Sequence, residues 1–139
     1  MFLMKAIEGN FAEVQMGELA QKNGQSAEVK SNGQMLQQDH GAANQKAMDA
    51  AKKLGVNAPS APSSKQKADY EKMAKTQGAA FDKAFAHHMV MDHNKDIAEY
   101  KRAANKDDDA GRYAKESLPV LEKHLQTAQS LQKNAGKSR

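Results

Sequence analysis

Apolar side chains recur along this chain at the three- and four-residue spacing that is typical of amphipathic helices. The first such segment covers residues 3–22, and Gly24 supplies a stop signal after it. Its apolar positions are Leu3, Ile7, Phe11, Val14 and Leu19. Ser26 suits the N-cap of a second helix over residues 26–54, and Gly55 follows as a C-terminal signal.

The remainder of the chain predicts a crossover followed by two long helices. Residues 55–64 hold two of the three prolines and are typical of an extended connection within one domain. The elements expected after it are a short helix over 65–76, a long helix over 79–104, a polar turn over 105–109 and a last helix over 110–134. Pro119 should kink or restart the last helix, and residues 135–139 should form a frayed tail.

Length and composition support an all-α fold. At 139 residues the chain fits one domain, which we take to span residues 1–139. Aromatic residues make up 5%, Trp is absent, and strong helix formers dominate the composition. Four main helices with a connection that carries an extra short helix predict a ferritin-like bundle with a crossover, not a plain up-and-down bundle.

Charge and cysteine content exclude several classes of function. The formal charge is +4, but 17 acidic residues are mixed among 21 basic ones, with no basic block, so nucleic acid is not an expected partner. Without cysteine the chain has no disulfide and no thiolate metal site. No apolar run reaches the roughly 20 residues of a membrane span, and the first residues do not resemble a signal peptide.

The histidines carry the clearest chemical signal. Asp39-His40 and Asp92-His93 form the same local pattern, because each follows an apolar residue four positions before the histidine. That spacing places the apolar residue and the histidine on one helical face, so both histidines should point into the core.

Counting from the turns places four candidate ligands at a similar height. Glu13, His40, His93 and His124 each lie 11 to 17 residues from a turn, on four different helices. If the connection crosses the bundle, the second and third long helices run parallel and the four side chains could converge.

One carboxylate and three imidazoles suit a transition metal, with zinc favoured and copper, nickel or iron as alternatives. Asp39 and Asp92 point about 100° away from their histidines and are expected to be outer hydrogen-bonding partners of the ligands. Carboxylate-rich di-iron chemistry is disfavoured because no Glu-x-x-His motif occurs. The alternative is a structural module whose buried histidines satisfy one another and nearby acids.

Two other histidines and one aspartate are expected to have structural roles or surface positions. His87 and His88 lie off the face of His93 and are expected on the surface. Asp82 is expected to cap the start of its own helix after Gly78.

Motifs on every main helix give the chain a family resemblance. They are Ala12-Glu13-Val14, Gly17-Glu18-Leu19-Ala20, Asp39-His40, Gly78-Ala79-Ala80-Phe81-Asp82-Lys83-Ala84-Phe85, Met89-Val90-Met91-Asp92-His93 and Leu118-Pro119-Val120-Leu121-Glu122-Lys123-His124-Leu125. In this order they closely resemble the bacterial domain-of-unknown-function family 4142.

The resemblance implies a ferritin-like bundle in a periplasmic or otherwise exported protein, with no settled activity. The family positions carry over onto Glu13, Asp39, His40, Asp92, His93 and His124. Leu36-Gln37 departs from the Met-Val pair that is common in the family before the first Asp-His. The expected function is therefore metal binding, in sequestration or a stress response, and no catalytic activity is assigned.

Overall fold

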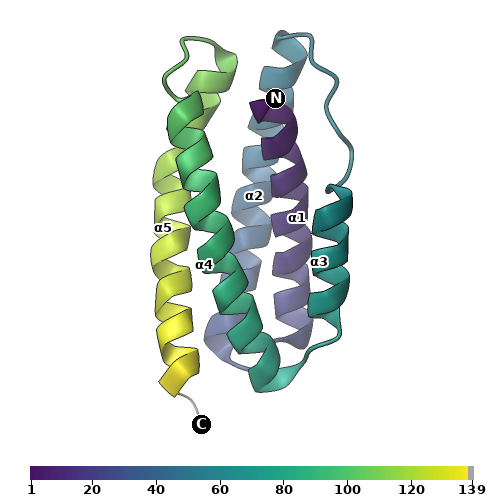
Figure 1. Ribbon diagram of the computed structural model, residues 1–139, viewed down its shortest axis with the longest axis vertical. Coiled ribbons are helices and arrows are strands. Elements are labelled where there is room, and N and C mark those ends of the chain that lie inside the picture. The colour runs from purple at the N-terminus through teal and green to yellow at the C-terminus, as the bar shows by residue number, and fades with distance from the viewer. Residues whose placement is uncertain (138–139) are drawn as a thin grey trace.

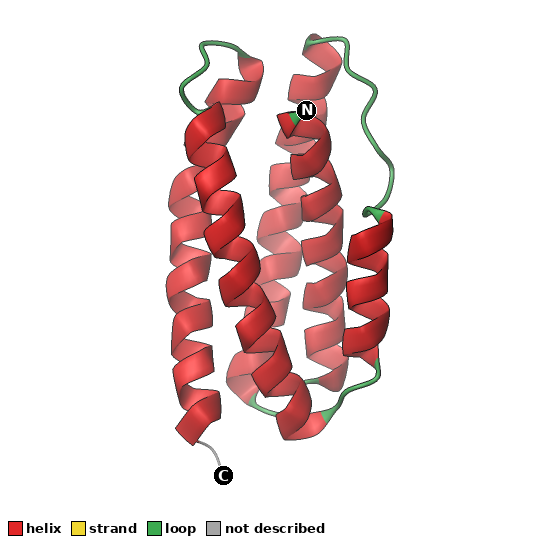
Figure 2. Cartoon of the chain, viewed as in Figure 1, coloured by secondary structure: helices red, strands yellow, loops and turns green. Residues whose placement is uncertain are grey.

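The computed structural model describes residues 1–137 as a bundle of helices (Figures 1 and 2). The elements are α1 (Phe2–Asn23), α2 (Ala27–Lys53), α3 (Ser64–Ala74), α4 (Gly78–Ala103) and α5 (Asp109–Lys137). Within the described range the only strand-like feature is an isolated parallel bridge between Gly24 and Gly78. The all-α prediction is confirmed.

The four long helices form two antiparallel pairs joined by a crossover (Figure 1). α1 packs along α2, and α4 packs along α5. The connection after α2 descends the outside of the bundle and leads into α3, which lies against the lower part of α1. As a result α2 and α4 run in the same direction, as the predicted crossover requires.

Capping residues mark the start and the end of α2 at the positions that the sequence predicts. The Ser26 side chain accepts a hydrogen bond from the backbone N–H of Val29 at 3.1 Å, as an N-cap does. Gly55 adopts a φ of +70°, which favours glycine, and the N–H of Val56 reaches the carbonyl of Ala51 at 2.8 Å. This pattern is a Schellman motif, and it turns the chain out of α2.

The Asp82 carboxylate plays a different role from the one expected. It accepts hydrogen bonds from the backbone N–H groups of Gln25 at 2.8 Å and Ser26 at 2.9 Å. The prediction that Asp82 caps its own helix is therefore wrong. The carboxylate instead ties the first turn of α4 to the α1–α2 turn, since a buried acid is stabilised by backbone donors wherever the fold brings them.

The C-terminal helix is more continuous than predicted. α5 runs unbroken through Pro119 from Asp109 to Lys137, so the helix does not restart at the proline. The expected frayed tail is helical as far as Lys137, and its last two residues lie outside the described residues. Packing of an amphipathic face along α4 compensates for the backbone hydrogen bond that proline cannot make.

Two glycines allow α1 and α2 to approach closely. A Cβ atom on Gly17 would lie 2.4 Å from the carbonyl oxygen of Gly33, and one on Gly33 would lie 2.6 Å from the carbonyl oxygen of Gly17. The backbones of the two helices therefore touch at this point, and only glycine fits at both positions.

The core consists of two apolar clusters with a polar layer between them. The upper cluster includes Leu3, Ile7, Ala47, Ile97, Tyr100 and Leu121, and the lower cluster includes Met16, Leu36, Phe81, Phe85, Met89 and Leu131. Between them each long helix contributes buried polar side chains, namely Asn10, Glu13, His40, Asn44, His93 and His124. The candidate ligands thus occupy one layer across the bundle.

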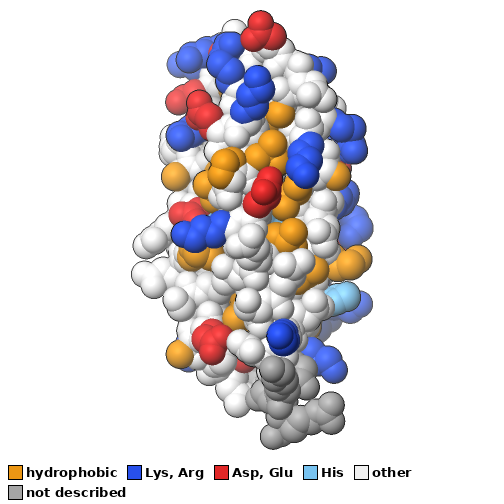
Figure 3. All heavy atoms as spheres, turned by 90° about the vertical axis from the view of Figure 1, so that its left-hand side faces the viewer, with side chains coloured by type: hydrophobic (Ala, Val, Ile, Leu, Met, Phe, Trp, Pro, Cys, Tyr) orange, Lys and Arg blue, Asp and Glu red, His pale blue; other side chains and the backbone are white. Residues whose placement is uncertain are grey.

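Figure 3 shows basic and acidic side chains interspersed over one face of the molecule, with small apolar areas between them. Among the described residues, no helix combines the length and hydropathy needed to cross a bilayer.

Candidate metal sites

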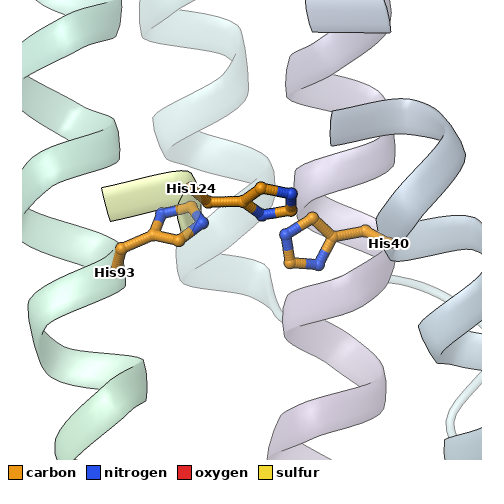
Figure 4. A group of neighbouring side chains, drawn as sticks. All are labelled: His40, His93 and His124. Atoms are coloured by element: carbon orange, nitrogen blue, oxygen red, sulfur yellow. The ribbon is translucent and has the colours of Figure 1, made fainter. Parts of the chain in front are cut away.

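Three histidines from three helices meet in the polar layer. His40 comes from α2, His93 from α4 and His124 from α5, and their rings face one another (Figure 4). The ring centroids lie 5.2–5.8 Å apart, and one ring nitrogen of each histidine lies within 4.8 Å of the other two. We call this group the histidine triad. The helical face predicted for His40 and His93 is the buried one, since at most 4% of either residue is exposed.

Each histidine of the triad is held by a hydrogen bond on its outer side. His40 Nδ1 lies 2.8 Å from Asn10 Oδ1, and His93 Nδ1 lies 2.9 Å from the carbonyl oxygen of Met89. His124 Nε2 lies 2.8 Å from Asp39 Oδ2. Asp39 is therefore an outer partner, as expected, although it contacts the histidine of α5 and not its sequence neighbour.

The inner nitrogens of the triad are buried without a partner. His40 Nε2, His93 Nε2 and His124 Nδ1 make no hydrogen bond in the described part of the chain. All three outer partners are acceptors, so each outer nitrogen carries a proton, and the inner nitrogen of a neutral ring then presents a lone pair. Three inward lone pairs cannot satisfy one another, whereas a cation would satisfy all three.

Burial keeps two histidines of the triad, His40 and His93, in the form that binds metals. It lowers the pKa of His40 well below the usual 6.5, and nearby His93 and His124 lower it further. Burial and the neighbouring His124 lower the pKa of His93 to about 4. These imidazoles are therefore neutral at physiological pH, and a metal ion would not have to displace a proton from them.

A cavity adjoins the triad on the side of α2 and α5. It measures about 170 Å³, and His40 and His124 form part of its wall together with Asn10, Asp39, Tyr100 and Tyr113. A three-histidine site leaves a fourth coordination position for water or a small ligand. The cavity reaches two of the three rings together with their outer partners Asn10 and Asp39, whereas the inner nitrogens of His40 and His124 are buried.

Glu13 does not join the triad. Its carboxylate groups instead with His88 and Asp92 of α4, with one ligand atom of each within 4.8 Å of the other two. These three residues line a cavity of about 310 Å³ with Asp96 of α4 and Asp69 of α3, and we call it the acidic cleft. Counting residues from the turns predicts how far along the bundle a side chain lies, but not in which direction it points from its helix axis. The Glu13 side chain points toward α4 and not toward the triad.

Negative charge is crowded in the acidic cleft. Burial raises the pKa of Glu13 well above the usual 4.5, and Asp92 and Asp96 raise it further. Burial, with Asp92 and Glu99, raises the pKa of Asp96 to about 7. Asp92 also makes an ion pair of 2.9 Å with His88 Nε2; burial alone would lower the pKa of His88, but Asp92 raises it above its usual value.

Two site residues were missed by the sequence analysis. His88 was expected on the surface, but its side chain is only 21% exposed and lies in the acidic cleft. Asn10 is the α1 residue that contacts the triad, through His40. The sequence does indicate that Asn10 is buried, because Leu3, Ile7 and Asn10 follow helical spacing. Asn10 is therefore a polar residue on the apolar face of its helix.

The fold and these clusters define a ferritin-like four-helix bundle with two groups of side chains that could hold a metal ion. The chain belongs to the family described as a domain of unknown function (DUF4142), whose model matches residues 1–131. The resemblance in the sequence motifs is thus confirmed over every main helix. No curated protein and no solved structure matches the chain. The family description names no activity.

Proposed function

We propose that the histidine triad binds one transition-metal ion, zinc in preference to copper or iron, and that the chain acts in metal sequestration or a related stress response. The observation that carries the proposal is the set of three buried ring nitrogens without partners, one from each histidine. A buried polar atom without a hydrogen bond costs about 1–3 kcal/mol, so a fold that gathers three of them favours an occupant.

The donor set supports zinc. Zinc accepts imidazole nitrogens at about 2.0–2.1 Å, and two nitrogens bound to one ion therefore lie at most about 4.2 Å apart. The triad nitrogens already lie within 4.8 Å of one another, so a small inward shift is sufficient. Copper and iron also accept imidazole, and the same site would admit them when zinc is scarce.

The rival function is a structural or interaction module, in which the buried histidines only satisfy one another and nearby acids. Its weakness is the arrangement of the outer partners. Asn10 Oδ1, the Met89 carbonyl and Asp39 Oδ2 all require a donor, so the neutral rings have no N–H left for one another.

Elemental analysis of protein purified without an affinity tag tests the proposal. We expect a stoichiometric amount of zinc in the native protein and its loss in His93→Asn, which can still donate to the Met89 carbonyl but lacks the inner nitrogen. His87→Asn is the matched control, because His87 is an exposed histidine of the same helix. Protein that holds no transition metal, with no change in melting temperature on adding zinc, copper or iron, would support the rival.

Export to the periplasm or cell envelope remains a prediction from the family resemblance. Fractionation of the cells that make this protein would test it, with recovery in the cytoplasmic fraction alone as the contrary result.

A further inference from the structure

The acidic cleft contains a second, separate group of side chains of the kinds that bind metal ions. His88, Asp92 and Asp96 follow one another at intervals of four residues, so they form a stripe along one face of α4. Glu13 meets this stripe from α1, and α3 contributes Asp69 to the wall of the cleft. His93, the next residue after Asp92, points about 100° away and belongs to the triad. α4 therefore presents a row of three residues to the cleft and one residue, His93, to the triad.

Glu13 is the residue in the cleft that most requires a partner. It is only 3% exposed, and its Oε2 atom has no hydrogen-bond partner within residues 1–137. This residue lines the cleft and groups with the ligand atoms of His88 and Asp92. A buried carboxylate is costly unless it is paired or coordinates a metal ion.

The cations around the cleft do not neutralise its acids. Glu8, Glu13, Asp69, Asp92, Asp96 and Glu99 face Lys5, Lys65, His88 and Lys95 in its walls. Lys65 is paired with Asp69 at 3.0 Å, and His88 is paired with Asp92 at 2.9 Å. In the described part of the chain, Glu13 and Asp96 take part in no salt bridge.

We propose that the acidic cleft is a second metal site, in which Glu13, His88 and Asp92 bind a divalent cation that prefers oxygen ligands, of the class of Mn²⁺ or Fe²⁺. Carboxylates suit such ions better than they suit copper, and one imidazole is compatible with both. Asp96 lines the same cleft beside these three residues. The two sites differ in donors, because the triad offers three nitrogens and the cleft offers two carboxylates and one nitrogen.

Mn²⁺ binding to the zinc-loaded full chain tests this proposal. Bound Mn²⁺ loses the sharp electron paramagnetic resonance signal of the free ion, so a titration counts the sites. We expect one Mn²⁺ per chain, and we expect Glu13→Gln to weaken its binding by about tenfold or more, since losing even an outer partner of a ligand costs 10–100-fold. Glu18→Gln, an exposed carboxylate on the same helix, should bind Mn²⁺ like the native chain.

Two further variants separate the cleft from the triad. Asp92→Asn repeats the test from α4 should Glu13→Gln fail to fold. His93→Asn should lose zinc and keep Mn²⁺, so failure of the triad proposal leaves this one standing. Unaltered Mn²⁺ binding in both folded cleft variants, absence of Mn²⁺ binding, or its loss in folded His93→Asn would each overturn the second site.

Discussion

Each ring of the histidine triad is oriented by a different kind of acceptor. His40 depends on an amide oxygen from α1, His93 on a backbone carbonyl of its own helix and His124 on a carboxylate from α2. The backbone acceptor cannot be removed by mutation, but the other two can. The contribution of the outer partners to metal binding can therefore be measured separately from the ligands.

Asn10→Ala should weaken zinc binding by about 10–100-fold while leaving all three ligands in place, because His40 loses the acceptor that fixes its tautomer and orientation. Asn10→Asp, which keeps an acceptor oxygen, should lose much less. Competition with a chromophoric chelator measures both affinities. Asn134→Ala is the control, since Asn134 is exposed and bonds only to Glu28 in the described structure. Equal affinity in Asn10→Ala and the native chain would exclude this role.

Asn10 also connects the triad to a buried tyrosine pair. Its amide nitrogen donates to the hydroxyl of Tyr113 at 3.0 Å, and the Tyr113 and Tyr100 hydroxyls lie 2.9 Å apart. Burial raises the pKa of Tyr100 well above the usual 10, with Tyr113 as a further cause, and burial raises the pKa of Tyr113 as well. The folded state therefore holds these protons more tightly than the unfolded chain does.

This difference predicts a loss of stability in alkali. A folded-state pKa above the unfolded value near 10 gives stability that is complete below pH 10 and lost as the pH rises through the folded pKa. Denaturant unfolding at a series of alkaline pH values should show a steeper fall for the native chain than for Tyr100→Phe. Tyr70→Phe, in the lower part of the bundle, should follow the native chain. If the free energy of unfolding fell with pH at the same rate in all three proteins, Tyr100 would not be the source of the alkaline loss of stability.

At the scale of the helices, the contact of α1 with α2 determines where their ligands lie. Gly17 and Gly33 bring the two backbones together one turn or more from Glu13 and His40. Any residue with a Cβ atom would push the helices apart, because the obstacle is a backbone carbonyl, which cannot rotate away. The same two helices contain glycines without such a restriction, at Gly9 and Gly41.

Gly17→Ala and Gly33→Ala should each destabilise the protein by about 1–3 kcal/mol, the usual cost of overpacking a core. Gly9→Ala and Gly41→Ala have no heavy atom within 4 Å of the new Cβ and should stabilise it by about 0.5–1 kcal/mol through helix propensity. Urea denaturation gives all four free energies of unfolding. The same sign for both pairs would show that the close approach does not matter.

The elements were largely predictable because their signals are local. Ser26 and Gly55 act on the backbone within a few residues, and helical spacing identified the buried faces of His40 and His93. The restart that the sequence allowed at Pro119 does not occur, because the packing of α5 against α4 is not visible in a local pattern. The prediction for Asp82 failed for the same reason, because the backbone N–H groups that donate to its carboxylate lie 56 and 57 residues earlier in the chain.

The sequence predicted the level of the candidate ligands along the bundle, but not the direction in which each side chain points from its helix axis. Counting residues placed the ligands in one layer, and the three histidines do meet there. The count could not tell that Glu13 faces α4 while Asn10, one turn earlier, faces His40. That difference is set by how the helices rotate about their axes when their side chains interlock, which depends on all the packed partners at once.

At the scale of the whole molecule, the polar layer divides the core into two apolar clusters. The triad takes His40 from one antiparallel helix pair and His93 and His124 from the other. A bound ion would therefore link the two pairs at the level where apolar packing is interrupted. Binding that is specific for the folded chain must then stabilise the entire bundle.

Zinc should raise the free energy of unfolding by about 2.7 kcal/mol when free zinc is at 100 times its dissociation constant. The gain should grow with zinc concentration and disappear on adding a chelator. His93→Asn should show no gain, and His87→Asn should respond like the native chain. Calorimetric melting at several zinc concentrations measures the effect; an increase that persists in His93→Asn would place the responsible ion elsewhere.

The most direct measurement is an anomalous difference map, collected at the zinc absorption edge, from crystals of the zinc-loaded protein. Zinc bound by the triad would give a peak at its centre, about 2.0–2.1 Å from His40 Nε2, His93 Nε2 and His124 Nδ1. A map with no peak among these three nitrogens, in crystals whose zinc content has been verified, would contradict zinc binding by the triad.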